Sequence, residues 1–185
     1  MRYNEIAEMA LAHMEFGTDD GTFTERFFIY INDAIRIIAR SLKLENVDPV
    51  VLTDSHFNVS DLSKKHVTKI VEVSNGSRQY RFVRGNSLGD FVVSGCNEST
   101  VSVRYRWMPA YNTNGDAEPE IPEVFHPILY LYVVHCHHNT RSTSTDYDRT
   151  KWLQEFERER RQIARAYGAH DAYEWKNRPW ETGEM

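Results

Sequence analysis

Residues 121–167 constrain the fold most strongly, because they have the pattern of two helices joined by a short polar turn. In the second half, Trp152, Phe156, Ile163 and Tyr167 recur along one face of a predicted helix. In the first half, the apolar stripe consists of Ile121, Val124, Phe125, Ile128, Leu129, Tyr132 and Cys136. Helices joined by a short turn are antiparallel neighbours, so this segment predicts a helical hairpin.

The ends of the two hairpin helices carry their own signals. Thr145, with Asp148 three residues later, has the spacing of a helix N-cap. Pro127 removes one backbone hydrogen bond inside the first helix, so that helix is expected to start late or to kink there. Gly168 is a plausible C-cap for the second helix.

Two further helices are predicted near the N-terminus. Apolar residues at helical spacing indicate a first helix over residues 4–16, and Gly17 to Gly21 end it. Thr22 and Glu25 have capping-box spacing and open a second helix that runs to Leu42 with a wide apolar stripe. This N-terminal helix pair and the C-terminal hairpin together predict a four-helix bundle.

Between the two helix pairs the periodicity changes to that of strands. Asn75-Gly76 is a type I′ hairpin signal, and apolar and polar residues alternate from Thr100 to Trp107. The β-branched and aromatic runs cover residues 50–53, 67–73, 79–83, 91–94 and 100–107. The predicted class is therefore α+β, a four-helix bundle with an inserted small antiparallel β-module.

This pattern divides the chain into four regions. Residues 1–46 are predicted to be the first half of the bundle, and 121–167 the second half. Residues 47–120 are the β-rich insert with a polar connector that is expected to be exposed. Residues 168–185 are an interaction tail without sustained periodicity.

Composition excludes several classes of protein. Hydrophobic residues make up 41% and charged residues 26%, values typical of a folded globular chain. A formal net charge of -5 argues against nonspecific binding of nucleic acid or an anionic membrane. The N-terminus does not have the pattern of a signal peptide, and no apolar run approaches the roughly 20 residues that span a bilayer. Cys96 and Cys136 are far apart, so a reducing compartment without disulfides is expected.

The run His135-Cys136-His137-His138 suggests a metal-binding site. These side chains are good zinc ligands, and His135 and His138 share one helix face. The chain contains no HExxH, CxxC or deaminase signature, and Cys136 continues the apolar stripe. Packing and helix-end roles are therefore favoured, and no cofactor is expected. A metal-dependent hydrolase or nuclease using His135 and His138 remains the alternative.

The tail carries large aromatics outside any periodic pattern. Tyr173, Trp175 and Trp180, with Arg178, are residue types that anchor protein interfaces, so they are the candidates for partner binding. The alternative is that the tail folds back on its own domain. Before the tail, the run of residues 155–161 interleaves glutamates with arginines, which indicates a solvated or inter-subunit face.

Several stretches follow one another in a characteristic order along the chain. They are Thr22-Phe-Thr-Glu25, Tyr30-Ile-Asn-Asp-Ala34, Ile37-Ile-Ala-Arg40, Val101-Ser-Val-Arg-Tyr105 and Ile121-Pro-Glu-Val-Phe-His-Pro127. This order of elements resembles the head-to-tail adaptor (connector) proteins of tailed bacteriophages. The resemblance covers roughly residues 4–167 and rests on pattern instead of a catalytic motif.

The resemblance implies a virion structural protein without catalytic activity. Such a protein is made in the host cytoplasm and forms a twelvefold ring in the virion neck, between the portal and a downstream neck or tail protein. DNA passes through the channel without sequence-specific binding, and no membrane is involved. The C-terminal segment reaches the portal, which would give Tyr173, Trp175 and Trp180 a role. A small intracellular binding module is the second alternative function.

Overall fold

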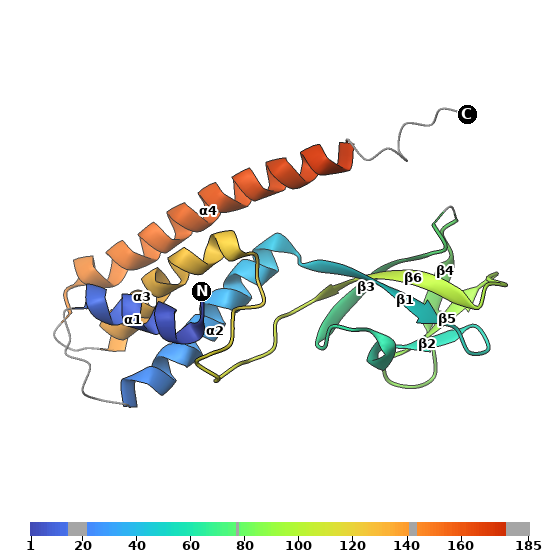
Figure 1. Cartoon of the computed structure of the whole chain (residues 1–185), viewed down its shortest axis with the longest axis horizontal. Coiled ribbons are helices and arrows are strands. Elements are labelled where there is room, and N and C mark those ends of the chain that lie inside the picture. Colours follow the sequence, from blue (N-terminus) through green and yellow to red (C-terminus); the bar gives the residue numbers. More distant parts are fainter. Residues whose placement is uncertain (15–21, 77, 141–143, 177–185) are drawn as a thin grey trace. The chain divides into compact units, whose positions relative to one another are not determined.

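The computed structural model describes residues 1–14, 22–76, 78–140 and 144–176, without the side chains of residues 22–24 and 169–176. Its contacts divide the chain into two compact units. The helical unit comprises Met1–Ile38 and Tyr111–Met185, and the β unit comprises Ala39–Ala110 (Figure 1). In the described part of the chain, no helix has the length and apolar character needed to cross a membrane.

The helical unit contains four α-helices and one 3-10 helix. In chain order they are α1 (Tyr3–His13), α2 (Thr22–Leu42), the 3-10 helix η2 (Glu123–Ile128), α3 (Leu129–Thr140) and α4 (Asp146–Lys176); the last turn of α2 belongs to the β unit. α3 lies between α1 and α4 and contacts both (Figure 1). The fully buried Phe27, Phe125 and Phe156 come from α2, η2 and α4, so the core draws on both ends of the chain.

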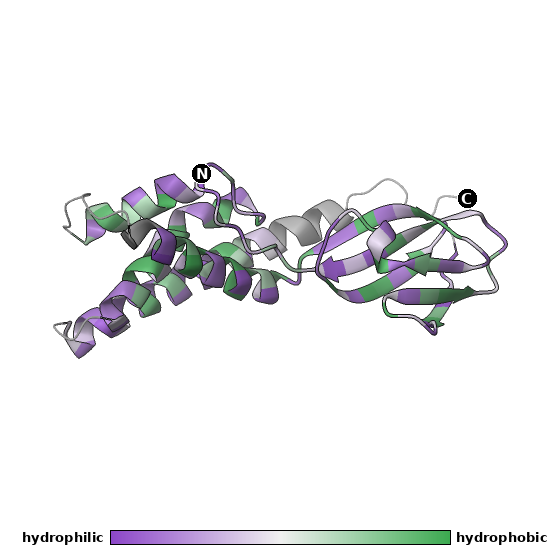
Figure 2. Cartoon of the chain, turned by 90° about the horizontal axis from the view of Figure 1, so that it is seen from below, coloured by the Kyte–Doolittle hydropathy of each residue, from purple (hydrophilic) through white to green (hydrophobic). Residues whose placement is uncertain are grey.

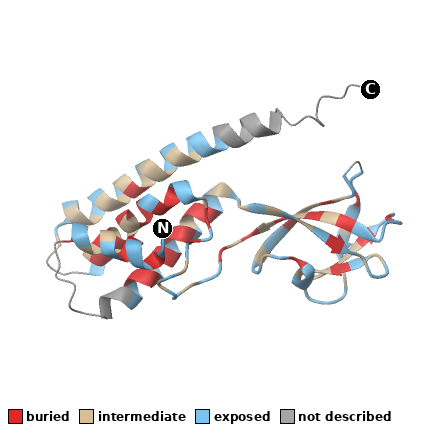
Figure 3. Cartoon of the chain, viewed as in Figure 1, coloured by how far each residue is buried: buried red, intermediate tan, exposed pale blue. Residues whose placement is uncertain are grey.

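The prediction of a four-helix bundle is wrong. The helices are too unequal for one, since α3 has 12 residues and α4 has 31. Pro127 limits α3, because the residues around it form η2 and the α-helix begins only at Leu129. Along residues 146–168 of α4 the only buried side chain is Phe156, whereas a bundle helix buries a continuous stripe (Figure 3). The fold is α+β, with four helices and two small antiparallel sheets.

The polar connector is largely exposed, as the sequence predicts, but its backbone also packs against the helical unit. Its backbone accepts hydrogen bonds from the start of α1, from the Tyr3 N–H to the Ala117 carbonyl (3.1 Å) and from the Asn4 N–H to the Gly115 carbonyl (2.9 Å). Pro119 is buried. The connector therefore belongs to the packing of the helical unit.

Asn32 of α2 is the polar residue at the centre of this packing. It is 2% exposed. Its Oδ1 accepts from the Tyr3 hydroxyl and from the Asn112 N–H, both at 3.0 Å. Its Nδ2 donates to the carbonyl oxygens of Phe28 and Asn112, both at 2.6 Å. One side chain thus joins α1, α2 and the connector with its full hydrogen-bonding capacity.

The β unit contains two three-stranded antiparallel sheets. One has the strand order β1 (Glu45–Val51), β6 (Thr100–Trp107), β3 (Val67–Ser74). The other has the order β2 (His56–Asn58), β5 (Asp90–Ser94), β4 (Arg81–Arg84), and a short 3-10 helix, η1 (Val59–Asp61), follows β2. Both polar and apolar residues occur along the strands (Figure 2), and they alternate strictly in β6.

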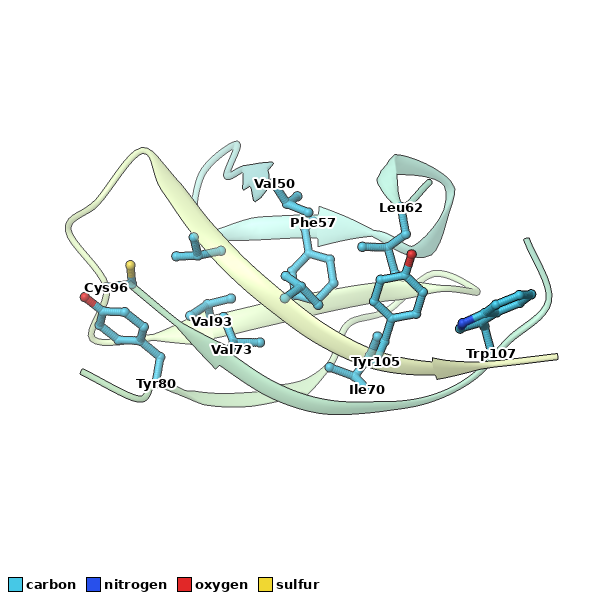
Figure 4. Close-up of a cluster of buried hydrophobic side chains, with 12 residues drawn as sticks. Val50, Phe57, Leu62, Ile70, Val73, Tyr80, Val93, Cys96, Tyr105 and Trp107 are labelled. Atoms are coloured by element: carbon cyan, nitrogen blue, oxygen red, sulfur yellow. The ribbon is translucent and has the colours of Figure 1, made fainter. Parts of the chain in front are cut away.

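Both sheets contribute to a single apolar core. Val73 and Tyr105 from the first sheet and Phe57 and Val93 from the second are each at most 3% exposed and lie in one cluster (Figure 4). β6 is the central strand of its sheet, and every second residue from Val101 to Trp107 is buried, as its alternation predicts. The short strand β2 is absent from the sequence prediction, because three residues are too few to show a period.

Two chain reversals differ from their predictions. In the turn after β3, Gly76 has a φ of 93°, but Asn75 does not adopt the left-handed region that a type I′ Asn-Gly turn requires. Instead, the Asn75 side chain accepts the N–H of Arg78 (3.1 Å). At the other end of the chain, α4 continues through Gly168 to Lys176, so Gly168 is not a C-cap.

Candidate functional site

The histidine cluster lies at the C-terminal end of α3, against the start of α4. His135 donates from Nδ1 to the carbonyl oxygen of Arg149 (2.7 Å), because a carbonyl can only accept. This fixes Nε2 as the acceptor, and Nε2 lies 3.0 Å from Asn139 Nδ2. Both ring nitrogens of His135 are therefore engaged by the protein.

The neighbouring histidines have similar packing roles. His138 Nδ1 lies 3.1 Å from the Ser144 hydroxyl. His137 is 6% exposed, and its ring meets Phe27 edge to face. Within the described residues no group of three or more His, Cys, Asp and Glu side chains could hold a metal ion. The two metal candidates, His135 and His138, instead join the end of α3 to the beginning of α4.

Cys136 is a protonated thiol in this setting. Burial raises its pKa to about 11, and the nearby Asp33 carboxylate also raises it, against a hydrogen bond with Tyr132 that lowers it. Burial, with Cys136 and Asp33 beside it, raises the pKa of Tyr132 to about 12. A thiol must ionise to act as a nucleophile or metal ligand, so this environment suits packing. Cys96 is a free, buried thiol in the β unit.

The start of α4 is capped as the sequence predicts. The Asp148 N–H donates to Thr145 Oγ1 (3.1 Å), and the Thr145 N–H donates to Asp148 Oδ2 (3.3 Å). These reciprocal bonds satisfy backbone donors that a helix N-terminus otherwise leaves free. The hydrogen bonds from Thr145 lower the pKa of Asp148, which keeps this carboxylate ionised next to the positive end of the helix dipole.

The charged run in the middle of α4 is paired within the helix. Arg158 contacts Glu155 (3.4 Å) and Glu159 (3.0 Å), and Arg160 contacts Glu157 (2.5 Å). Surface pairs of this kind, some exposed and that of Arg160 half-buried, contribute little to stability, typically up to about 1 kcal/mol. They leave these arginines less available for phosphate groups, in agreement with a solvated face.

The candidates for partner binding lie at the end of the chain. Tyr173 and Trp175 belong to the backbone of α4, but their side chains are outside the described part of the structure. Arg178 and Trp180 lie outside the described residues altogether. The sequence predicts an irregular tail after Gly168, whereas Tyr173 and Trp175 are carried by a continuous helix.

The β unit holds one cluster around an ionised carboxylate. Asp48 accepts hydrogen bonds from the Tyr105 hydroxyl and the Ser63 N–H, both at 2.6 Å, and from Asn46 Nδ2 at 2.9 Å. Burial alone would raise the pKa of Asp48, but these hydrogen bonds hold it below its ordinary value. Tyr105, which is fully buried, also accepts the Lys64 N–H (3.1 Å). The cluster ties the segment after η1 to β1 and β6.

Replacing Tyr105 by phenylalanine is expected to destabilise the β unit by about 1.5–3 kcal/mol at neutral pH, the usual range for a hydrogen bond to a charged group. Because the folded-state pKa of Asp48 is lowered, its contribution is present above the unfolded pKa of about 4 and is lost as the pH falls through the folded value. The difference between variant and wild type should therefore shrink in acid. Urea unfolding, monitored through the hydrogen exchange of β6 amides, measures this difference in the free energy of unfolding. The control is Tyr147→Phe, at an exposed tyrosine. An equal difference in acid would contradict the role of Asp48.

Comparison with the known protein families and with curated protein sequences gives no match to this chain.

Proposed function

We propose that this chain is a head-to-tail adaptor of a tailed bacteriophage, a virion structural protein whose ring joins the portal to the tail and continues the DNA channel. The supporting observation is the order of its units. Segments from both ends of the chain, Met1–Ile38 and Tyr111–Met185, make one helical unit, and the β unit is inserted between them. This is the arrangement that the resemblance of residues 4–167 to such adaptors implies.

The distribution of charge also supports passage of DNA. The helical unit has 12 Lys and Arg against 20 Asp and Glu, whereas the β unit has 10 against 7. The formal charges are therefore -8 and +3. Binding of DNA depends on neutralising its phosphates with cations, so an acidic surface facing a channel lets DNA slide without sequence-specific contacts.

A structural role also agrees with the chemistry of the histidine cluster. His135 is bonded through both ring nitrogens, and Cys136 is held as a thiol. In the proposed assembly, each chain contacts identical neighbours in a twelvefold ring in the neck of the virion. Its other partners are the portal protein and the next neck or tail protein. Tyr173, Trp175, Arg178 and Trp180 would be the anchors on the portal.

Mixing the chain with the portal protein encoded in the same genome tests the proposal. We expect a complex with one adaptor per portal subunit, measured by native mass spectrometry, even where the isolated chain is a monomer. Replacing Tyr173, Trp175 and Trp180 by alanine should weaken binding by at least about thirtyfold, which is the effect of losing a single anchor of roughly 2 kcal/mol. Tyr147→Ala, at a 70% exposed aromatic of the same helix, is the matched control and should bind normally.

Failure to bind the portal would contradict the proposal. A second measurement separates it from the hydrolase or nuclease alternative. Protein purified without a histidine tag is analysed for zinc and for phosphodiester hydrolysis, beside His135→Ala. Stoichiometric zinc and an activity that the variant loses would replace the structural proposal with an enzymatic one.

A further inference from the structure

A groove of about 760 Å³ lies in the β unit, between strands that belong to its two different sheets. One wall comes from Val67 to Ile70 of β3. The other comes from Phe82 to Arg84 of β4, with Phe91 behind them on β5. We call this cavity the β3–β4 groove. Its apolar lining includes Val67, Ile70, Phe82 and Phe91.

Both walls of the β3–β4 groove are edge strands. β3 pairs with β6, and β4 pairs with β5, each on one side only within the described residues. The two edges are joined near the turn, where the Tyr80 N–H donates to the Val73 carbonyl (2.8 Å). Beyond this bond and the bridge between Ser74 and Gln79, no pairing connects the described parts of β3 and β4. An edge strand that forms the wall of such a groove has unpaired backbone N–H and C=O groups, which another chain can bond.

The hydrogen-bond register identifies which backbone groups of β4 are free. The Gly85 N–H donates to the Asp90 carbonyl (2.9 Å), in line with the pairing of β4 and β5. Because hydrogen-bonded pairs alternate along an antiparallel ladder, Val83 and Arg81 bond to β5. Phe82 and Arg84 then direct their N–H and C=O groups away from β5, toward the free edge. Tyr80 has the same parity, and its N–H does point to β3.

The charges around this edge are mostly positive and unpaired. Lys69, Arg81 and Arg84 are exposed, and no carboxylate in the described chain pairs with them. The acidic residue of the groove, Asp90, is already held by His56 (3.1 Å). An occupant that carries carboxylates would therefore find cations free to receive it.

Two apolar side chains beside the edge are unusually exposed. Val83 on β4 is 58% exposed, and Leu88 in the loop after β4 is fully exposed. The loop that displays Leu88 is nevertheless ordered by backbone bonds, from the Asp90 N–H to the Ser87 carbonyl (3.2 Å) and from the Val59 N–H to the Gly89 carbonyl (2.8 Å). Val83 and Leu88 both line the groove, so these apolar side chains are available to contact an occupant of it.

We propose that the β3–β4 groove binds an extended acidic segment of a partner protein, which adds to the free edge of β4 as a further strand. The backbone groups of Phe82 and Arg84 supply the main-chain hydrogen bonds, the apolar lining receives alternate side chains, and the free cations pair with its carboxylates. The proposal concerns the β unit alone and stands whether or not the chain is a phage adaptor.

The test uses the full chain labelled with nitrogen-15 and a set of probes. The first is the peptide acetyl-Glu-Val-Glu-Val-Glu-Val-Glu-amide, about as long as an ordinary strand. The second replaces every glutamate by lysine, and the third is a single-stranded oligothymidine. We expect the glutamate peptide to shift and protect the amides of Phe82 and Arg84, while Arg81 and Val83, already bonded to β5, change little.

Charge and apolar contacts are then tested separately. The lysine peptide should bind at least about tenfold more weakly, and the double variant Lys69→Glu, Arg84→Glu should reverse this preference. Both substituted residues are exposed, and an otherwise unchanged amide spectrum shows that the fold is kept. A peptide with serine in place of valine should lose most of the binding.

Each of these outcomes would overturn the proposal: protection outside β4, equal binding of the glutamate and lysine peptides, equal binding of the serine peptide, or competition by the oligothymidine for the same amides. The last would indicate a nucleic-acid surface instead. Absence of any shift at millimolar peptide would also overturn it, since a strand addition with free main-chain partners should be detectable there.

Discussion

Replacing Asn32 by leucine is expected to lower the free energy of unfolding of the helical unit by roughly 3–5 kcal/mol. Leucine has nearly the same volume, so the loss comes from polar groups and not from a cavity. The Tyr3 hydroxyl and both backbone groups of Asn112 would lose their partner. Each buried group left without a hydrogen bond costs about 1–3 kcal/mol.

Circular dichroism at the helix band during urea unfolding measures this effect, because nearly all helix belongs to the helical unit. Asn139→Leu is the matched control, since Asn139 is exposed at the end of α3 and the substitution removes one solvent-exposed hydrogen bond, to His135, at a cost of about 1 kcal/mol or less. Similar losses for the two variants would show that the hydrogen bonds of Asn32 do not contribute to the free energy of unfolding of the helical unit.

Phe156→Ala is expected to release α4 from the helical unit, with a loss of about 3–5 kcal/mol for a buried phenylalanine. Phe156 is fully buried, and its ring lies 5.2 Å from that of Tyr132, centroid to centroid. Along residues 146–168 it is the only buried side chain, and the other contacts of that stretch, such as the Arg149 carbonyl with His135 and the Tyr167 ring with Phe125, involve half-buried or exposed residues of α4. The exposed ion pairs of α4 cannot compensate for it.

Hydrogen exchange resolved by segment measures this release. Protection should fall first in α4, with a smaller change in α3, against which Phe156 packs, and none in the β unit. Tyr147→Ala removes a 70% exposed aromatic from the same helix and should leave exchange unchanged. Uniform loss of protection across the helical unit would mean that Phe156 stabilises the whole core and not the docking of one helix.

Local periodicity predicts a large part of these elements. The bounds of α2, the alternation of β6 and the reciprocal cap formed by Thr145 and Asp148 agree with the sequence. Each depends on residues a few positions apart. The number of sheets does not depend on such nearby residues. It depends on pairings such as those of β6 with β1 and β3, which are far from it in sequence. The bundle prediction failed for a similar reason, since amphipathic spacing does not tell how much of a helix is covered.

In the candidate site too, the sequence predicts what depends on neighbouring residues but not the contacts with residues far along the chain. The spacing of His135 and His138 identifies their shared helix face, but not the Arg149 carbonyl and the Ser144 hydroxyl that engage them. Asn32 has four hydrogen bonds, two of them with a residue 80 positions away. The β3–β4 groove has no sequence signal beyond Leu88, an apolar residue placed between turn formers.

The order of the units along the chain also sets the order in which the protein is completed on the ribosome. All strands of the β unit are made before α3 and α4 exist, so the β unit can fold while the helical unit is still half synthesised. Until η2 and α3 are synthesised, they cannot cover the apolar stripe of α2. Asn32 likewise lacks its hydrogen bonds with Asn112 until that residue is made. The newly made chain therefore passes through a stage with an exposed apolar helix, which is the form that chaperones bind.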